Sequence, residues 1–158
     1  MIPKNLSEIE EIRKECKWMV AKRAVVSGAA NLVPLPGVDI AVDIGLLMKL
    51  LPAINQKFGL SPEQIDELDP QVRIMIYNLI VTLGTQTAGK VITKQIIVSV
   101  LKKFGVKLAG KQVAKFIPII GQATAFTISV AAMKYVGDTH INECYRLSQQ
   151  IIKAQRVA

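Results

Sequence analysis

Apolar residues recur at three- and four-residue steps through most of the chain, which is the spacing of one face of an α-helix. In the first segment this spacing predicts a helix that Asn5 or Ser7 could cap and that runs to about Leu32. Runs of Ile and Val such as residues 95–98 would also suit a strand. Their helical spacing and the absence of hairpin signals favour a helix instead.

Proline, glycine and capping residues predict where the later helices begin and end. A second helix is expected from about Val38 to Lys57 or Phe58, followed by Gly59 as a C-terminal cap. The remaining expected helices are Pro62 to about Leu68, Pro70 to Gly84 or Ala88, Val91 to Phe104, Val106 to Phe116, Ile119 to about Val136, and Thr139 to Ile152. The sequence therefore predicts an all-α fold, a compact bundle of about seven or eight helices that forms a single domain over residues 1–158.

Two Pro/Gly corners resemble one another. A shift of 84 positions places the segment 33–37 against the segment 117–121, and helical patterns flank both. One interpretation is a duplicated helix–turn–helix unit, so that two similar hairpins pack together; the other is chance similarity between two helical hairpins. The residues expected to form these structural turns are Pro34, Pro36, Gly37, Pro118 and Gly121.

The uncharged stretches are short for a membrane span, which needs about 20 mostly apolar residues. Asp39 and Asp43 would lie inside any span built around the first corner, and buried carboxylates are costly there. The pattern therefore favours hairpins folded into a compact body over a transmembrane topology. Hydrophobic helices that lie on a bilayer, or enter it, are still compatible with the sequence.

Charge is distributed unevenly along the chain. Residues 70–137 carry nine Lys or Arg and no Asp or Glu, whereas residues 1–69 carry eight basic and ten acidic residues. An acid-free, apolar block predicts a basic surface that meets an anionic partner. The lysines expected to bind a membrane or a partner follow four-residue steps and are Lys90, Lys94, Lys103, Lys107, Lys111 and Lys115.

This lysine pattern also has a plainer interpretation, an ordinary solvated helix face. As a lipid-binding surface, its lysines would each contribute about 1 kcal/mol near acidic headgroups. Nucleic acid is the less favoured partner, because the 70–137 block has one arginine and few aromatic residues for base stacking or readout.

The sequence contains no convincing catalytic, cofactor or metal site. Asp39 and Asp43 lie one helical turn apart, which would suit an acid–base pair or a metal site. A charge stabilised in the first turn of a helix explains Asp39 better, and pairing with a nearby Lys or Arg explains Asp43 better. His140 is the only histidine and is expected on a helix surface; two distant cysteines, Cys16 and Cys144, do not complete a zinc site with it. We therefore expect no enzyme activity. The absence of a secretory leader favours a reduced, cytoplasmic protein over one with a disulfide.

Several motifs, in order, resemble the helical domain of the immunity-related GTPases. They are residues 33–44, the segment Lys57-Phe58-Gly59-Leu60, and residues 116–121 with the helix that follows down to 141–143. Related helical domains occur after bacterial GTPases and in EcsC-like proteins, and the resemblance covers about Val25 to Tyr145. The phosphate-binding loop of a GTPase is missing, because neither Ala88-Gly89-Lys90-Val91 nor Ala109-Gly110-Lys111-Gln112 has the required glycine and Ser/Thr.

The resemblance implies a helical domain, without the GTPase domain, of a kind that elsewhere mediates membrane contact, self-association or regulation. We expect a non-catalytic binding module that engages an anionic membrane surface, a protein partner such as a GTPase or a second copy, or both. It would be cytoplasmic and peripherally associated with membranes. The alternatives are a membrane-inserting, pore-forming or toxin-like helical protein and a small immunity or regulatory partner of a separate protein.

Overall fold

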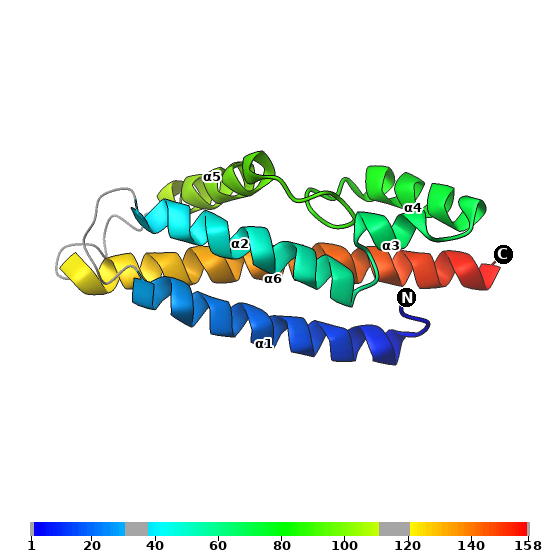
Figure 1. The fold of residues 1–158 in the computed structure, drawn as a ribbon, viewed down its shortest axis with the longest axis horizontal. Helices are drawn as coiled ribbons and strands as arrows, with labels where there is room; N and C mark the ends of the chain where they lie inside the picture. The colour runs from blue at the N-terminus through cyan, green and yellow to red at the C-terminus, as the bar shows by residue number, and fades with distance from the viewer. Residues whose placement is uncertain (1, 31–37, 111–120, 158) are drawn as a thin grey trace.

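A computed structural model describes residues 2–30, 38–110 and 121–157, and the side chains of residues 2–29, 44–103 and 130–156. These ranges form helices and connecting segments and contain no strand. The helices, labelled in Figure 1, are α1 (Leu6–Ala30), α2 (Val38–Lys57), α3 (Pro62–Asp66), α4 (Pro70–Leu83), α5 (Lys94–Gly110) and α6 (Gly121–Val157). The predicted all-α fold is confirmed.

Local capping chemistry sets several helix ends as the sequence predicts. Ser61 and Gln64 form a capping box at the start of α3, in which each side chain bonds the other's backbone N–H. Gly59 and Gly84 have φ values of 68° and 61° after α2 and α4, so each occupies the left-handed conformation that favours glycine. Asn5 caps α1 by accepting the N–H of Glu8 at 2.9 Å.

The number of helices differs from the prediction. The described ranges contain six helices, because α5 continues through Gly105 and α6 continues through Gly137, where the sequence predicted breaks. A glycine inside a helix costs only about 1 kcal/mol, which tertiary packing can offset. A Cβ on Gly137 would lie 2.6 Å from Cγ2 of Val20, so this glycine lets α1 approach α6 closely.

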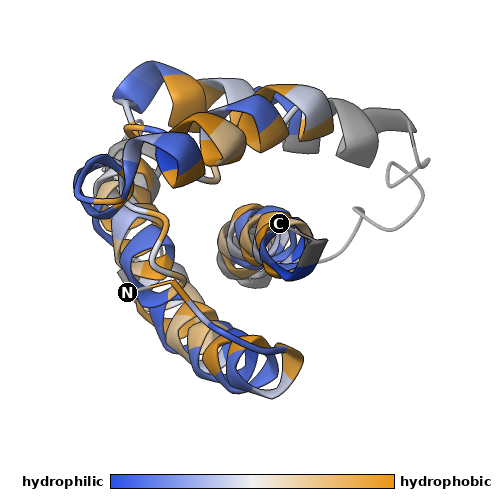
Figure 2. Cartoon of the chain, turned by 90° about the vertical axis from the view of Figure 1, so that its right-hand side faces the viewer, coloured by the Kyte–Doolittle hydropathy of each residue, from blue (hydrophilic) through white to orange (hydrophobic). Residues whose placement is uncertain are grey.

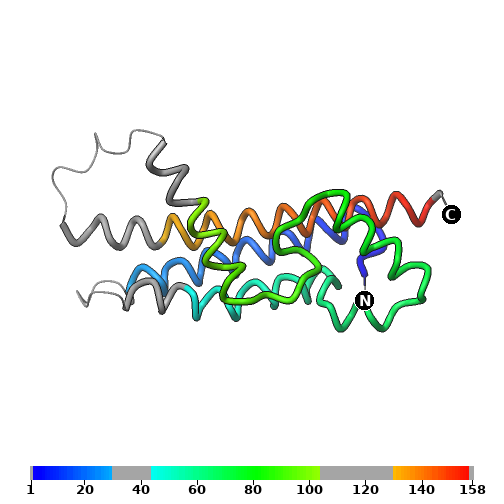
Figure 3. Tube along the Cα trace, turned by 90° about the horizontal axis from the view of Figure 1, so that it is seen from above, coloured from blue at the N-terminus to red at the C-terminus, as the bar shows by residue number. Residues whose placement is uncertain are grey.

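The long helix α6 runs through the middle of the molecule, antiparallel to α1 (Figures 1 and 3). Viewed along its length in Figure 2, α6 lies inside an arc formed by α1, α2 and the α4–α5 layer, and α1 and α5 lie on opposite sides of it. The shared core is mainly aliphatic. Its fully buried side chains include Ile9, Leu47, Leu51, Ile54, Ile76, Ile97, Ile141, Leu147 and Ile151.

The outer face of α1 carries an exposed aromatic side chain. Trp18 is the only tryptophan of the chain and keeps 60% of its surface exposed. The ammonium of Lys22, one turn further along the helix, lies 3.6 Å from the centroid of the indole ring. This face of α1 is turned away from the core.

The predicted corners fall almost wholly outside the described residues. Pro34, Pro36, Gly37 and Pro118 belong to the ranges that are not described, whereas Gly121 is the first residue of α6. The internal repeat and the two-hairpin layout therefore stay predictions. Within the described ranges, no helix combines the length and the apolar character that a bilayer crossing requires.

Candidate anion-binding site between α5 and α6

The segment 84–93, which joins α4 to α5, is held in place by a half-buried carboxylate. Glu143 of α6 accepts the backbone N–H groups of Gln86 at 3.0 Å, Thr87 at 2.9 Å and Ala88 at 3.2 Å. Burial acts to raise the pKa of Glu143, but the hydrogen bonds from this segment outweigh it and hold the pKa below its usual value. The successive N–H groups thus form a concave anion site that Glu143 itself occupies.

His140, one turn before Glu143 on α6, is buried and not on the surface as predicted. Only 1% of its surface is exposed, because α6 is enclosed on several sides. Its Nε2 lies 3.0 Å from the Leu51 carbonyl oxygen and its Nδ1 lies 2.6 Å from the Thr87 hydroxyl. Burial lowers the pKa of His140 to about 4, so the imidazole is neutral at pH 7.

Asn55 of α2 fixes the same segment from the other side. Its Nδ2 donates to the carbonyl oxygens of Thr87 at 3.5 Å and Lys90 at 3.3 Å, and its Oδ1 accepts the N–H of Gly89 at 3.3 Å. The half-buried Lys90 turns back and donates to the carbonyl oxygen of Thr85. Its ammonium group therefore bonds within the segment 84–93 and does not add to the exposed lysines of α5.

Three lysines of α5 are exposed to solvent, namely Lys94, Lys102 and Lys103. The predicted series that begins at Lys103 is described only at that residue. Lys107 lies on α5, but its side chain is outside the described part of the chain, and so are the whole residues Lys111 and Lys115. Lys102 was not among the predicted residues, because it lies outside the four-residue series that begins at Lys103. Its position next to Lys103 in an acid-free helix was the available signal.

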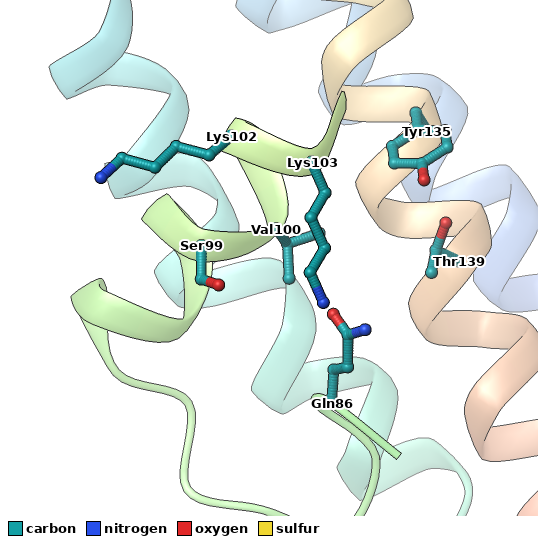
Figure 4. A pocket seen from close by; sticks show the side chains of 7 residues that line it. All are labelled: Gln86, Ser99, Val100, Lys102, Lys103, Tyr135 and Thr139. Carbon is teal, nitrogen blue, oxygen red and sulfur yellow. The ribbon is translucent and has the colours of Figure 1, made fainter. Parts of the chain in front are cut away.

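A pocket of about 660 Å³ lies between α5, the segment 84–93 and α6 (Figure 4). Its lining residues are Gln86, Ser99, Val100, Lys102, Lys103, Tyr135 and Thr139. In Figure 4 the Lys103 ammonium points toward the Gln86 amide, while Lys102 points away from it. A neighbouring pocket of about 400 Å³ along α5 is lined by Lys94, Gln95, Val98, Ser99 and Lys102. None of the described residues that line these two pockets is acidic.

The lining of the larger pocket suits an anion. Ammonium, amide and hydroxyl groups all donate hydrogen bonds to an anion. Cys144 and His140 lie close, with Sγ 3.7 Å from Nε2, but burial raises the pKa of the Cys144 thiol well above its usual value, so it stays protonated. No group of His, Cys, Asp and Glu suited to a metal ion occurs among the described residues, which exclude the Asp39 and Asp43 side chains.

Both cysteines are buried free thiols in the structure, Cys16 on α1 and Cys144 on α6. Burial raises the pKa of Cys16 to about 11. Neither thiol is therefore poised to act as a nucleophile at neutral pH, which leaves the α5–α6 pocket as the candidate site.

The chain is similar to part of a known GTPase. It is 26% identical over 156 residues to interferon-inducible GTPase 5 of Bos taurus and 25% identical to that of Rattus norvegicus; each alignment covers 95% of this chain and 33% of the relative. No family model matches, and no solved structure matches. The chain thus spans about a third of the length of these relatives. Nearly the whole of this helical chain is similar to one portion of an interferon-inducible, immunity-related GTPase.

Proposed function

We propose that this chain is a non-catalytic helical binding module whose α5 face engages an anionic membrane surface. The observation that carries the proposal is the group of exposed lysines Lys94, Lys102 and Lys103, which line two adjoining pockets without an acidic neighbour among the lining residues. Each lysine near an acidic bilayer surface contributes about 1 kcal/mol of attraction. Three of them together supply a weak, salt-sensitive attachment.

The packing of α5 favours attachment at the surface over insertion. Ile97 and Val100 are buried in the shared core, so the apolar side of the described part of α5, up to Lys103, is already covered by the protein. Insertion into hydrocarbon would first have to remove these side chains from the core. The pore-forming alternative therefore carries an extra cost that surface binding avoids.

The similarity to a portion of an interferon-inducible GTPase supports a regulatory or localising module and does not extend GTP binding to this chain. The second candidate function is a regulatory partner of a separate protein. This function is favoured by α4, because its Ile74 and Val81 are both exposed on the face of the helix that does not pack on the core. Exposed apolar side chains that share a helix face suit a protein partner.

Flotation with vesicles that contain phosphatidylserine tests the proposal. The variant Lys94→Glu, Lys102→Glu, Lys103→Glu should lose vesicle binding, while Lys14→Glu, Lys17→Glu, Lys153→Glu makes the same charge change at exposed positions elsewhere and should retain most of it. A second variant with Glu at Lys103, Lys107, Lys111 and Lys115 tests the predicted stripe.

Each other result points to one alternative. Release of an entrapped dye would favour a membrane-inserting, pore-forming protein. Absence of vesicle binding at low salt would contradict the proposal and favour the protein-partner role. Equal loss in both triple variants would mean that net charge, and not the α5 face, governs binding.

A further inference from the structure

We propose that the pocket between α5 and α6 selects a phosphomonoester over a phosphodiester or a carboxylate. This inference rests on the proposed function and names the chemical group that the same site recognises. It is drawn from the pocket residues Gln86, Ser99, Lys103 and Thr139. Both a lipid headgroup and a soluble phosphate ester can present this group.

The donors converge from separate elements. Gln86 belongs to the segment before α5, Ser99 and Lys103 belong to α5, and Thr139 belongs to α6. In Figure 4 the Lys103 ammonium and the Gln86 amide point toward one another across the pocket, with the α6 side chains to one side. A phosphomonoester offers three strong acceptor oxygens, which matches donors that approach from several directions.

Charge also favours the monoester. A phosphomonoester carries about −1.5 to −2 charges at pH 7, whereas a phosphodiester or a carboxylate carries a single negative charge. Lys102 and Lys103 both line the pocket, and no ion pair found in the described part of the chain involves either lysine. The Lys103 ammonium, which points toward Gln86, and the positive charge of Lys102 next to it on α5 favour the more highly charged ligand.

The buried network below the pocket fixes two of the donors. Gln86 directly precedes Thr87, and its own N–H is bonded to Glu143 at 3.0 Å. Thr139 directly precedes His140, whose ring is bonded on both sides. Because these backbone positions are held, the pocket needs little rearrangement when an anion enters, which lowers the cost of binding.

Two kinds of vesicle provide the first arm of the test. Vesicles with phosphatidic acid and vesicles with phosphatidylserine are prepared at matched surface charge. Phosphatidic acid should bind about tenfold more tightly at pH 7.5, which corresponds to about 1.4 kcal/mol, because its additional charge strengthens the hydrogen bonds from the pocket. The preference should shrink at pH 6, where the phosphomonoester loses part of its second charge.

Variants assign the preference to the pocket. Lys103→Gln and Thr139→Val should each remove most of the preference for phosphatidic acid, while Lys153→Gln, at an exposed lysine of α6 outside both pockets, should retain it. Circular dichroism and the urea midpoint show whether each variant is folded. Equal binding of both vesicles, or a preference that survives both pocket variants, would overturn the inference.

The second arm uses soluble glycerol 3-phosphate, with acetate as the carboxylate control, in a titration followed by NMR. Shifts near Gln86 and Thr139 that Lys103→Gln abolishes would support the inference with a soluble ligand as the source. If they occur without any vesicle binding, the membrane proposal fails while the phosphomonoester inference holds. If vesicles bind without selectivity and glycerol 3-phosphate gives no shifts, the membrane proposal holds and the inference fails.

Discussion

The two sides of the segment 84–93 use polar residues in opposite ways. On the inner side, Thr87 is buried and bonded to Glu143 and His140. On the outer side, Gln86 is exposed and faces a pocket with Thr139. The inner and outer residues are direct neighbours in the sequence, Gln86 and Thr87 in the segment and Thr139 and His140 in α6. The inner groups nevertheless hold the fold together, while the outer groups face the pocket, where a ligand could bind. A polar residue therefore acts structurally or in binding according to whether the protein supplies its partner.

Removing the carboxylate on the inner side should give the largest effect. Glu143→Ala leaves the N–H groups of Gln86, Thr87 and Ala88 without their acceptor, and we expect a loss of about 4 kcal/mol in the free energy of unfolding. Urea denaturation followed by circular dichroism measures it. A loss under about 1 kcal/mol would show that the inner side is not structural.

Acid should weaken the inner side by a similar mechanism. The pKa of His140 is about 4 in the folded protein and 6.5 in the unfolded chain, so only the unfolded state gains this proton as the pH falls from 6.5 to 4. Stability is therefore full above pH 6.5 and falls by about 3 kcal/mol by pH 4. The lowered pKa of Glu143 acts in the same direction at still lower pH, because the unfolded carboxylate is protonated first.

The variant His140→Gln isolates this effect, since the chain has no other histidine. Its urea midpoint should vary less between pH 7 and pH 5 than that of the unaltered chain, whatever its absolute stability. Identical slopes over this range would mean that another group causes the acid sensitivity.

The tight contact between Gly137 of α6 and Val20 of α1 lies away from the polar groups, so its disruption gives a loss of stability with which theirs can be compared. Gly137→Ala would place a Cβ 2.6 Å from Val20, so we expect a loss of about 2 kcal/mol from overpacking. Val20→Ala in the same chain should recover part of this loss, and thermal unfolding measures both. Additive losses would show that the two residues are not in contact.

On the outer side, substitutions should hardly change stability. Lys103→Gln removes an exposed charge that forms no ion pair with any residue the structure describes, and we expect a change within about 0.5 kcal/mol in the free energy of unfolding. The same variant should lose the preference for a phosphomonoester. If it unfolds the protein instead, the contrast between the two sides fails.

The sequence predicted helix ends where neighbouring residues decide them. The capping box at Ser61 and the left-handed glycines Gly59 and Gly84 depend on a few adjacent residues. By contrast, Gly105 and Gly137 lie inside helices despite their low helix propensity, and at Gly137 the close approach of Val20 from α1 favours a residue without a Cβ. Local sequence alone does not contain that information.

The candidate site was predicted only in part for the same reason. Its lysines lie in the acid-free block, but Gln86, Lys103 and Thr139 come together only through the tertiary fold. The buried position of His140 did leave a signal, because it lies four residues after Val136 and four before Cys144, in step with the apolar face of α6. A polar residue in such a register is better read as a buried, hydrogen-bonded group.

The exposed Trp18 is an intrinsic fluorescent probe of the surface of α1. As the sole indole, it lies on α1, on the side of α6 opposite α5. Its emission should stay red-shifted and open to quenching by acrylamide when only α5 is occupied. A blue shift would report instead that a membrane or a protein has covered α1, so unlabelled protein can reveal which flank has been engaged.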